Sequence, residues 1–440
     1  MNGGSGGGRM AELEVMFDGS SLTKQRSVES VSSSVFDKLT DELLIETLIR
    51  LPIKPANLCK CVSIRFRSLI STSYFVRCYL NHHQINNSFA LYYQSKPTFH
   101  NMIRPSLMGI DIAFGFPIFE SPGFSLSFLA SSDSEQQNQE TFQYLASNNG
   151  LVLCCAAMRR PIVYFVCNPL TKQWISLPPP PSNVKTVYTG FICNPQYSCN
   201  DDRKTSFKVV RIEVVKCESP RQLSGTLKLE IFCSILGKWA EEYFMSSSNL
   251  DHELFYGWNY RCPSAVVCDG LLHWDTLSNC GIFTYDPYNG ECRTIELPRE
   301  IRKPLWALKY CLGESAGCLR YANFSWDDTN YRVWELKNGG ESEWLLLHEV
   351  HLDEMKSTVE TINKDCMGLL SPHPLDQDVV FFWCRSSCRI VEYNMRNKIL
   401  KLPCFLRDMK IISLLSPMFF PFVLPCWPTT VPLIKQHDLS

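Results

Sequence analysis

The chain has 440 residues, of which 45% are hydrophobic and 20% are charged, and its formal net charge is −1. This length exceeds that of one small domain, and the composition is ordinary for a folded globular protein. The near-zero net charge excludes bulk attraction to nucleic acid or to an anionic membrane. The 21 cysteines are an odd number with irregular spacing, and the first 35 residues have no apolar stretch of signal-peptide type. We therefore expect a reducing compartment, the cytoplasm and/or the nucleus, where cysteines act as small buried apolar side chains.

Residues 1–34 are rich in glycine and serine, which predicts a flexible arm. Residues 36–80 instead have the apolar spacing of short helices. Thr40 is a predicted N-cap, Pro52 is predicted to end the first helix, and Pro55 fits the first turn of a second. Ser73 is the predicted cap of a last helical turn.

About 45 residues cannot bury a self-sufficient core, so the surplus apolar surface of this segment needs either the rest of the chain or a partner. The apolar positions that carry it are Leu39, Leu43, Leu44, Ile45, Leu48, Ile49, Leu51, Pro52, Leu58, Cys61, Val62, Phe66, Leu69 and Ile70.

Beyond residue 85 the pattern changes to short strands, for example at 207–215, 227–233 and 331–336. A motif also repeats. Asn149-Gly150 and Asp269-Gly270 each open an apolar run, and a Leu-Pro pair closes each copy 28 residues after the glycine, at Pro178 and Pro298. A weaker third copy runs from Asp378 to Pro403.

The closing prolines lie 120 and then 105 residues apart. Because propeller blades have roughly 40–50 residues, each gap should hold two or three blades, with Trp239 and Trp334 as markers of the intervening ones. A two-sheet sandwich with coincidental repeats is the alternative. We expect an α+β multidomain chain in which the helical segment precedes a large all-β propeller of about six to eight blades.

The stretch from Leu39 to Pro52 and its continuation from Cys61 to Arg77 resemble the F-box. The Asn-Gly-Leu openings, Asn-Pro-x-Thr turn and Leu-Pro ends resemble the kelch-like propeller domain of plant F-box proteins. The chain departs from the F-box pattern at Thr40, Ile64 and Phe66, where proline, lysine and tryptophan are usual, which predicts weaker docking to the partner. The resemblance implies an F-box at 36–80, a propeller at 85–425 and a Pro-rich tail at 426–440.

The resemblance further implies a non-catalytic substrate receptor of a ubiquitin ligase. The apolar positions named above would bind a Skp-type adaptor and, through it, a cullin, and the propeller would bind a target protein that the sequence does not identify. Alternatives are a free-standing propeller interaction module, in which the helices form a cap on the propeller, and a metal-dependent propeller oxidase.

No catalytic or metal-binding pattern is found, and we expect no cofactor and no metal. Cys59/Cys61 and Cys384/Cys388 are not joined by a histidine pair at ligand spacing, and His273 is expected in the core. The uncharged stretch from Ile411 to Ile434 contains five prolines, which favours a final strand and a packed tail over a membrane helix. The insertion Thr98–Glu140 is a candidate target-binding loop or a segment without function.

Overall fold

The computed structural model describes the helical segment, most strands and part of the C-terminal tail: residues 39–83, 88–94, 107–111, 126–129, 142–156, 162–169, 171–183, 188–194, 206–215, 226–245, 264–275, 281–301, 308–325, 330–337, 343–351, 354, 367–384, 389–405, 418–424 and 429–432. The predicted flexible arm, 1–34, lies outside these residues. The chain divides into two compact units, Met1–Leu48 and Ile49–Ser440, which are described separately.

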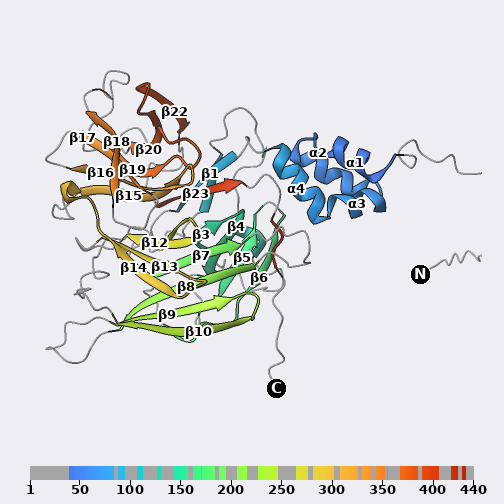
Figure 1. The fold of residues 1–440 in the computed structure, drawn as a ribbon, viewed down its shortest axis with the longest axis horizontal. Coiled ribbons are helices and arrows are strands. Elements are labelled where there is room, and N and C mark those ends of the chain that lie inside the picture. Colours follow the sequence, from blue (N-terminus) through green and yellow to red (C-terminus); the bar gives the residue numbers. More distant parts are fainter. Residues whose placement is uncertain are drawn as a thin grey trace, which may run out of the picture. The chain divides into compact units, whose positions relative to one another are not determined.

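The described helices all lie between residues 41 and 82, apart from two short 3-10 turns, η3 (Leu126–Leu129) and η4 (Arg299–Ile301). The unit Met1–Leu48 contributes α1 (Asp41–Leu48). The second unit begins with α2 (Ile53–Leu58), the 3-10 turn η2 (Cys59–Cys61), α3 (Ile64–Ile70) and α4 (Ser73–His82) (Figure 1). The change from helices to strands beyond residue 85 is thus confirmed.

Five antiparallel four-stranded sheets follow in chain order, and each is built from four consecutive strands. The first blade contains β3 (Phe142–Asn148), β4 (Leu151–Ala156), β5 (Tyr164–Asn168) and β6 (Gln173–Ser176). The second contains β7 (Tyr188–Asn194), β8 (Ser206–Val215), β9 (Thr226–Cys233) and β10 (Lys238–Met245). The third contains β11 (Val266–Cys268), β12 (Leu271–Asp275), β13 (Ile282–Asp286) and β14 (Glu291–Ile295).

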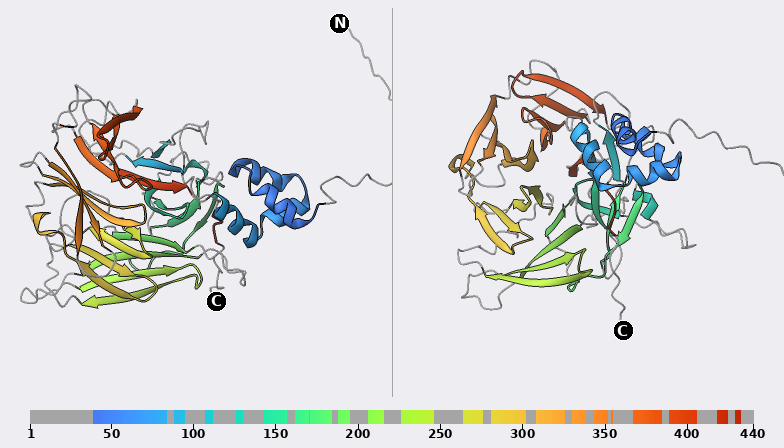
Figure 2. Two further views of the ribbon diagram at one scale, coloured as in Figure 1. Left: turned by 45° about the horizontal axis from the view of Figure 1, so that its top comes forward. Right: turned by 45° about the vertical axis from the view of Figure 1, so that its right-hand side comes forward.

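The fourth blade contains β15 (Leu308–Ser315), β16 (Cys318–Ser325), β17 (Asn330–Leu336) and β18 (Trp344–His351). The fifth contains β19 (Met367–Pro372), β20 (Val379–Cys384), β21 (Arg389–Asn394) and β22 (Ile399–Phe405). Figure 2 shows the blades following one another around a ring, which is a β-propeller. The sandwich alternative is therefore wrong.

A three-stranded closing sheet completes the ring, in the order β2 (Leu107–Asp111), β1 (Ser88–Gln94) and β23 (Met418–Leu424). Its strands come from opposite ends of the propeller segment, and β23 contacts both β19 of the fifth blade and β3 of the first. The strand expected near the C-terminus is thus present as β23. Backbone hydrogen bonds between β1 and β23 therefore join distant segments within the closing sheet, which in turn contacts the last and the first blade.

The predicted count of six to eight blades is wrong, because the described residues form five four-stranded blades. The closing prolines were correctly read as blade ends, and each of the two gaps between them holds two blades, within the two or three expected. Because the two gaps of 120 and 105 residues hold two blades each, a blade takes up about 50–60 residues of this chain, more than the usual 40–50. The kelch-like assignment stays a prediction.

The repeated motif has a physical basis in turn geometry. Asn149-Gly150, Asp269-Gly270 and Ala316-Gly317 all have positive φ at both positions, which is the backbone of a two-residue hairpin turn. After the third strand, the Oδ1 atom of Asp286 accepts from the backbone N–H of Asn289, and the Oδ1 atom of Asn394 does the same for residue 397. The same turn chemistry thus recurs between blades: the two-residue hairpin joins the first two strands of the first, third and fourth blades, and the side-chain turn follows the third strand of the third and fifth.

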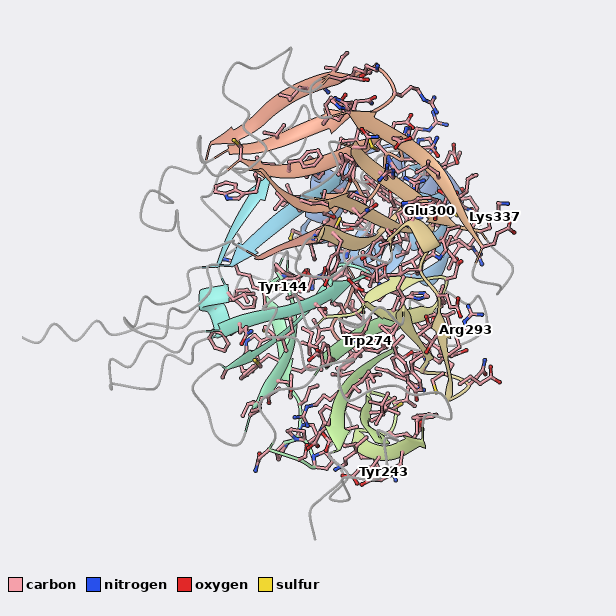
Figure 3. All side chains as sticks on the ribbon, turned by 90° about the vertical axis from the view of Figure 1, so that its left-hand side faces the viewer. Tyr144, Tyr243, Trp274, Arg293, Glu300 and Lys337 are labelled. Carbon is pink, nitrogen blue, oxygen red and sulfur yellow. The ribbon has the colours of Figure 1, made fainter. Side chains whose placement is uncertain are left out.

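The apolar core lies between neighbouring blades. Trp274 of β12 is 1% exposed, packs against the second blade, and its Nε1–H donates to the Thr189 carbonyl of β7 at 3.3 Å. Figure 3 shows Trp274 and Tyr144 inside the propeller, with Tyr243 and Lys337 towards its outer surface. The two sheet faces of each blade are thus covered by adjacent blades, as stacked repeats require.

The last residues described, 429–432, pack on the first blade. The Asn168 Nδ2 atom donates to the Thr429 carbonyl at 2.6 Å, and the Thr429 Oγ1 donates to the Asn149 carbonyl at 2.5 Å. Thr429 is 1% exposed, and Val431 packs against the core between the first and second blades. Within the described residues, no helix is long and apolar enough to span a membrane.

Candidate functional site

The first helix, α1, carries both buried and exposed apolar side chains. The Leu44 backbone N–H donates to the Thr40 carbonyl at 3.1 Å, and that of Leu43 to the Thr40 Oγ1 at 3.4 Å, so the predicted cap is confirmed. Leu44 and Leu48 are buried, whereas Leu43 is 54% exposed. Within α1, Leu43 is therefore the docking candidate that a partner can reach.

The second helix begins at Ile53, so Pro55 lies in its first turn, as predicted. Helical backbone continues through η2 to Val62, whose N–H donates to the Cys59 carbonyl at 3.1 Å. Leu58 and Val62 are four residues apart and therefore share one side of this helical stretch. They are 60% and 69% exposed, which leaves an apolar strip uncovered by the described residues.

The third helix is held by a well-formed N-terminal cap. Ser63 has an extended backbone, and its Oγ accepts from the Phe66 N–H at 3.1 Å. Phe66 and Ile70 are four residues apart and both buried, so they define the inner side of α3. The departure from tryptophan at position 66 is thus accommodated as a core aromatic residue.

The fourth helix is tied to the segment before α2. The Tyr79 hydroxyl donates to the Leu51 carbonyl at 3.0 Å, and the His83 Nε2 donates to the Ile49 carbonyl at 2.7 Å. The cap of α4 is Thr72, whose Oγ1 accepts from the Phe75 N–H, so the assignment of the cap to Ser73 is wrong by one residue. Both threonine and serine can cap a helix, and the sequence alone does not distinguish adjacent candidates.

The predicted docking residues fall into three groups by exposure. Those that are buried are Leu44, Leu48, Ile49, Phe66 and Ile70. Those of intermediate exposure are Leu39, Ile45, Leu51 and Leu69. Those that are exposed are Leu43, Pro52, Leu58, Cys61 and Val62.

One exposed apolar residue was absent from the predicted docking set. Ile64, the first residue of α3, is 87% exposed, which is the highest value among the large apolar side chains described. Its spacing could have revealed this, because two residues along a helix rotate a side chain by about 200°, so Ile64 lies opposite the buried Phe66. We call Leu58, Val62 and Ile64 together the α2–α3 surface.

The surroundings of the α2–α3 surface are basic. Residues 49–83 contain no aspartate or glutamate, while Arg65 and Arg67 lie on α3 itself. The Arg67 Nε donates to the Lys60 carbonyl at 3.2 Å, and burial lowers the pKa of the Lys60 ammonium. An apolar strip with a cationic border favours a protein partner that is apolar at the centre and acidic at the edge.

The propeller offers no comparable chemical site among its described residues. No three His, Cys, Asp or Glu side chains in the described ranges lie close enough to hold a metal ion. His273 is 3% exposed, its Nδ1 lies 2.9 Å from the Thr284 hydroxyl, and burial lowers its pKa to about 4. It is thus a neutral core histidine, as the sequence indicated.

Cysteines of the described blades are mainly core residues. Cys154 and Cys167 are fully buried on neighbouring strands, and neither forms a disulfide. Burial raises the pKa of the Cys155 thiol to about 12, so it is not a thiolate nucleophile at neutral pH. Cys59 and Cys61 are intermediate and exposed, respectively, which corrects the expectation of a buried structural role for that pair.

The predicted target-binding insertion, Thr98–Glu140, lies largely outside the described residues. Its described parts are β2 and η3, and Leu126 and Leu129 of η3 pack into the core of the first blade. These two side chains are thus structural, and the role of the insertion in target binding stays a prediction.

Comparison with known proteins identifies the family. The family described as F-box protein At3g26010-like, beta-propeller, matches residues 119–410. Arabidopsis thaliana F-box protein At3g26010 is 24% identical over 451 residues, covering 91% of this chain and 92% of the relative. F-box protein At5g49610 of the same plant is 25% identical over 372 residues, covering 82% and 89%.

A solved structure, TolB from Acinetobacter baumannii, aligns with a TM-score of 0.38 and 11% identity, covering 79% of this chain and 69% of that one. Five four-stranded blades and the family match over residues 119–410 together place this chain in the F-box protein At3g26010-like β-propeller family.

Proposed function

We propose that this protein is the substrate-recognition subunit of a Skp-cullin-F-box ubiquitin ligase. Residues 36–80 bind a Skp-type adaptor, which connects the chain to a cullin, and the propeller binds a target protein. The observation that carries the proposal is the α2–α3 surface, three apolar side chains that the described residues leave exposed next to a basic border. Family membership supports the same role.

In this role the chain supplies proximity and no reacting group. The ligase holds the target beside a conjugating enzyme that carries ubiquitin. The encounter between target lysine and ubiquitin thereby changes from bimolecular to effectively unimolecular. The protein acts without metal or cofactor, in the cytoplasm and/or the nucleus. Fluorescent tagging of the full chain in plant cells tests the location, and signal confined to the secretory pathway would contradict it.

The docking experiment should alter only exposed side chains. Leu44 is buried, so replacing it would unfold the helix as well as any interface. The variant Leu58→Asp/Val62→Asp instead places two carboxylates on the α2–α3 surface without opening a core. We expect this variant of the full chain to lose co-purification with a Skp-type adaptor.

Ile235→Asp is the matched control, because Ile235 is 69% exposed like Val62 but lies in the propeller turn between β9 and β10. It should retain the adaptor. If the wild type, the double variant and Ile235→Asp capture the adaptor equally well, the adaptor does not bind at Leu58 and Val62. If the wild type captures no adaptor, the proposed function is wrong. Affinity capture under a neddylation block then identifies the target.

A further inference from the structure

The turn between β9 and β10 presents apolar side chains where the other blades have polar ones. Ile235 and Leu236 form the tip of this turn and are 69% and 53% exposed. At the place of Leu236, the corresponding turns of the first, third and fifth blades have Thr171, Asn289 and Asn397. An exposed Ile-Leu pair at this place is unusual, because polar residues are preferred in turns.

The Ile-Leu pair is held outward by hydrogen bonds at both ends of the turn. The Ser234 N–H donates to the Phe207 carbonyl at 3.0 Å, and the Ser234 Oγ accepts from the Phe207 N–H at 2.8 Å. At the other end, the Gly237 N–H donates to the Cys233 carbonyl at 2.8 Å, and Gly237 has a φ of 67°. A partner therefore meets a turn that is already ordered, and little conformational freedom is lost on binding.

A third exposed side chain comes from the neighbouring blade. Lys208 of β8 lies opposite Cys233, the residue before the turn. Its Nζ donates to the Pro287 carbonyl at 2.5 Å and lies 4.8 Å from the centroid of the Tyr288 ring. Tyr288 is 46% exposed, and its turn in the third blade thus lies against the base of the turn in the second. We call the three exposed side chains together the second–third blade surface: Ile235, Leu236 and Tyr288.

The charges next to this surface are cationic on the side of the second blade. Lys208 is partly exposed, and Lys238 begins β10 and is exposed. Among the described residues, neither ammonium group forms an ion pair with a carboxylate. The Asp286 carboxylate of the third blade is used by its own turn, where its Oδ1 accepts from the Tyr288 and Asn289 N–H groups. A carboxylate of a partner therefore finds a counter-charge at Lys208 or Lys238 for which no described carboxylate competes.

We propose that the second–third blade surface is a target-binding site of the propeller and takes a short acidic and apolar segment of the target protein. Apolar side chains of this segment pack on the three side chains of the surface, and a neighbouring aspartate or glutamate pairs with Lys208 or Lys238. Three partly exposed side chains offer far less than the roughly 800 Å² per partner of a standard interface, which favours a short segment over a folded domain. This inference rests on the proposed function, in which the propeller binds a target, and adds the place and the chemistry of binding.

The test selects binding peptides without assuming a sequence. A phage-displayed library of random peptides is selected on the purified full chain, and the enriched peptides are synthesised and measured by fluorescence anisotropy. We expect them to combine leucine, isoleucine or phenylalanine with aspartate or glutamate. The variant Ile235→Asp/Leu236→Asp should bind them at least about tenfold more weakly, because one lost apolar contact corresponds to about a factor of ten. Leu375→Asp/Ile399→Asp, the same changes at two exposed apolar residues of the fifth blade, should leave the affinity unchanged.

Two milder changes separate the apolar contact from the electrostatic one. Ile235→Ala/Leu236→Ala removes the apolar side chains without adding charge and should also weaken peptide binding about tenfold. Lys238→Gln should weaken it about threefold and should reduce the loss of affinity that the wild type shows when salt is added. The three positions are exposed, so thermal unfolding of these variants should match that of the wild type.

The outcomes separate this inference from the proposed function. If no peptide is enriched, if the enriched peptides lack acidic residues, or if they bind the Asp and Ala variants as tightly as the wild type, the inference is wrong. Self-association of the wild type in sedimentation velocity that both variants lose would instead assign the surface to a second copy of this chain. If peptide binding behaves as expected but the wild type captures no Skp-type adaptor, the proposed function fails and the surface belongs to a free-standing interaction module.

Discussion

The helical segment and the propeller differ in how completely they bury their apolar side chains. In the propeller, Trp274 and Tyr331 are at most 1% exposed because a neighbouring blade covers each sheet face. Between α2 and α3, in contrast, Leu58, Val62 and Ile64 are all more than half exposed. A closed ring gives every blade an internal partner, whereas a segment of about 45 residues has more apolar surface than it can bury. The difference indicates which part of this protein needs another molecule.

The sharpest test of this comparison uses two residues of the same helix. Phe66→Ala should destabilise α3 by about 3–5 kcal/mol, limited by the local stability of the segment, because a buried ring leaves a cavity. Ile64→Ala should change stability by less than about 0.5 kcal/mol because its side chain is already in water. Hydrogen exchange of the α3 amides measures both. Similar losses for the two variants would show that Ile64 is covered in solution.

A second test concerns burial of charge in the propeller. The pKa of His273 is about 4 because burial disfavours the imidazolium, whereas an unfolded histidine has a pKa of 6.5. The unfolded state therefore binds the proton more tightly, and stability should fall as the pH decreases from 6.5 to 4, by at most about 3 kcal/mol. Urea unfolding at several pH values in this range measures how steeply the free energy of unfolding changes with pH. The His273→Gln variant should show a smaller change. The exposed His82→Gln is the control and should retain the slope.

A third test concerns the fit between the second and third blades. A Cβ at Gly190 would lie 2.7 Å from Cζ2 of Trp274 and 2.8 Å from Leu272, whereas at Gly368 the nearest atoms are 3.9 Å away. Gly190→Ala should thus cost about 1–3 kcal/mol through overpacking. Gly368→Ala should be close to neutral. Thermal unfolding compares the two variants, and equal stability would mean that the blades adjust without strain.

The smallest effect is expected at the C-terminal segment that packs on the first blade. Thr429→Val keeps the side-chain volume but removes the hydroxyl that donates to the Asn149 carbonyl. Stability should fall by about 1 kcal/mol, because a part-buried acceptor loses its partner. Thr430→Val is the matched control at the adjacent exposed position. If Thr429→Val has the same denaturation midpoint as the wild type, water replaces the hydrogen bond to the Asn149 carbonyl.

Several features were predictable because they depend on neighbours in sequence. The Thr40 cap, the end of α1 before Pro52, the Asn-Gly and Asp-Gly turns and the strands from β8 to β9 all follow from local backbone and side-chain preferences. The α4 cap was displaced by one residue because Thr72 and Ser73 have equivalent capping groups. The blade count was wrong because it was calculated from an average blade length, whereas a blade of this chain takes up more residues.

Other features depended on contacts between distant residues. Trp344 donates its Nε1–H to the Glu296 carbonyl 48 residues earlier, as Trp239 does to Pro178. The sequence pointed to Trp239 as a blade marker but not to Trp344, because only the ring places the fourth strand of one blade beside the end of the preceding one. The set of docking residues predicted from the sequence likewise contained both buried and exposed side chains, because the sequence does not show which of them are covered by other parts of the fold.

By itself, the sequence determined the order of helices before strands, the turn chemistry that divides the blades, and the helical segment whose apolar surplus points to a partner. Periodicity and turn residues act over a few positions, and a single chain displays them directly. The tertiary structure decided that five four-stranded blades are joined by a closing sheet from both ends of the propeller segment. It also decided that Leu44 and Phe66 face inward while Leu58, Val62 and Ile64 face solvent. Burial is set by what packs against a side chain, and that depends on residues far away along the chain.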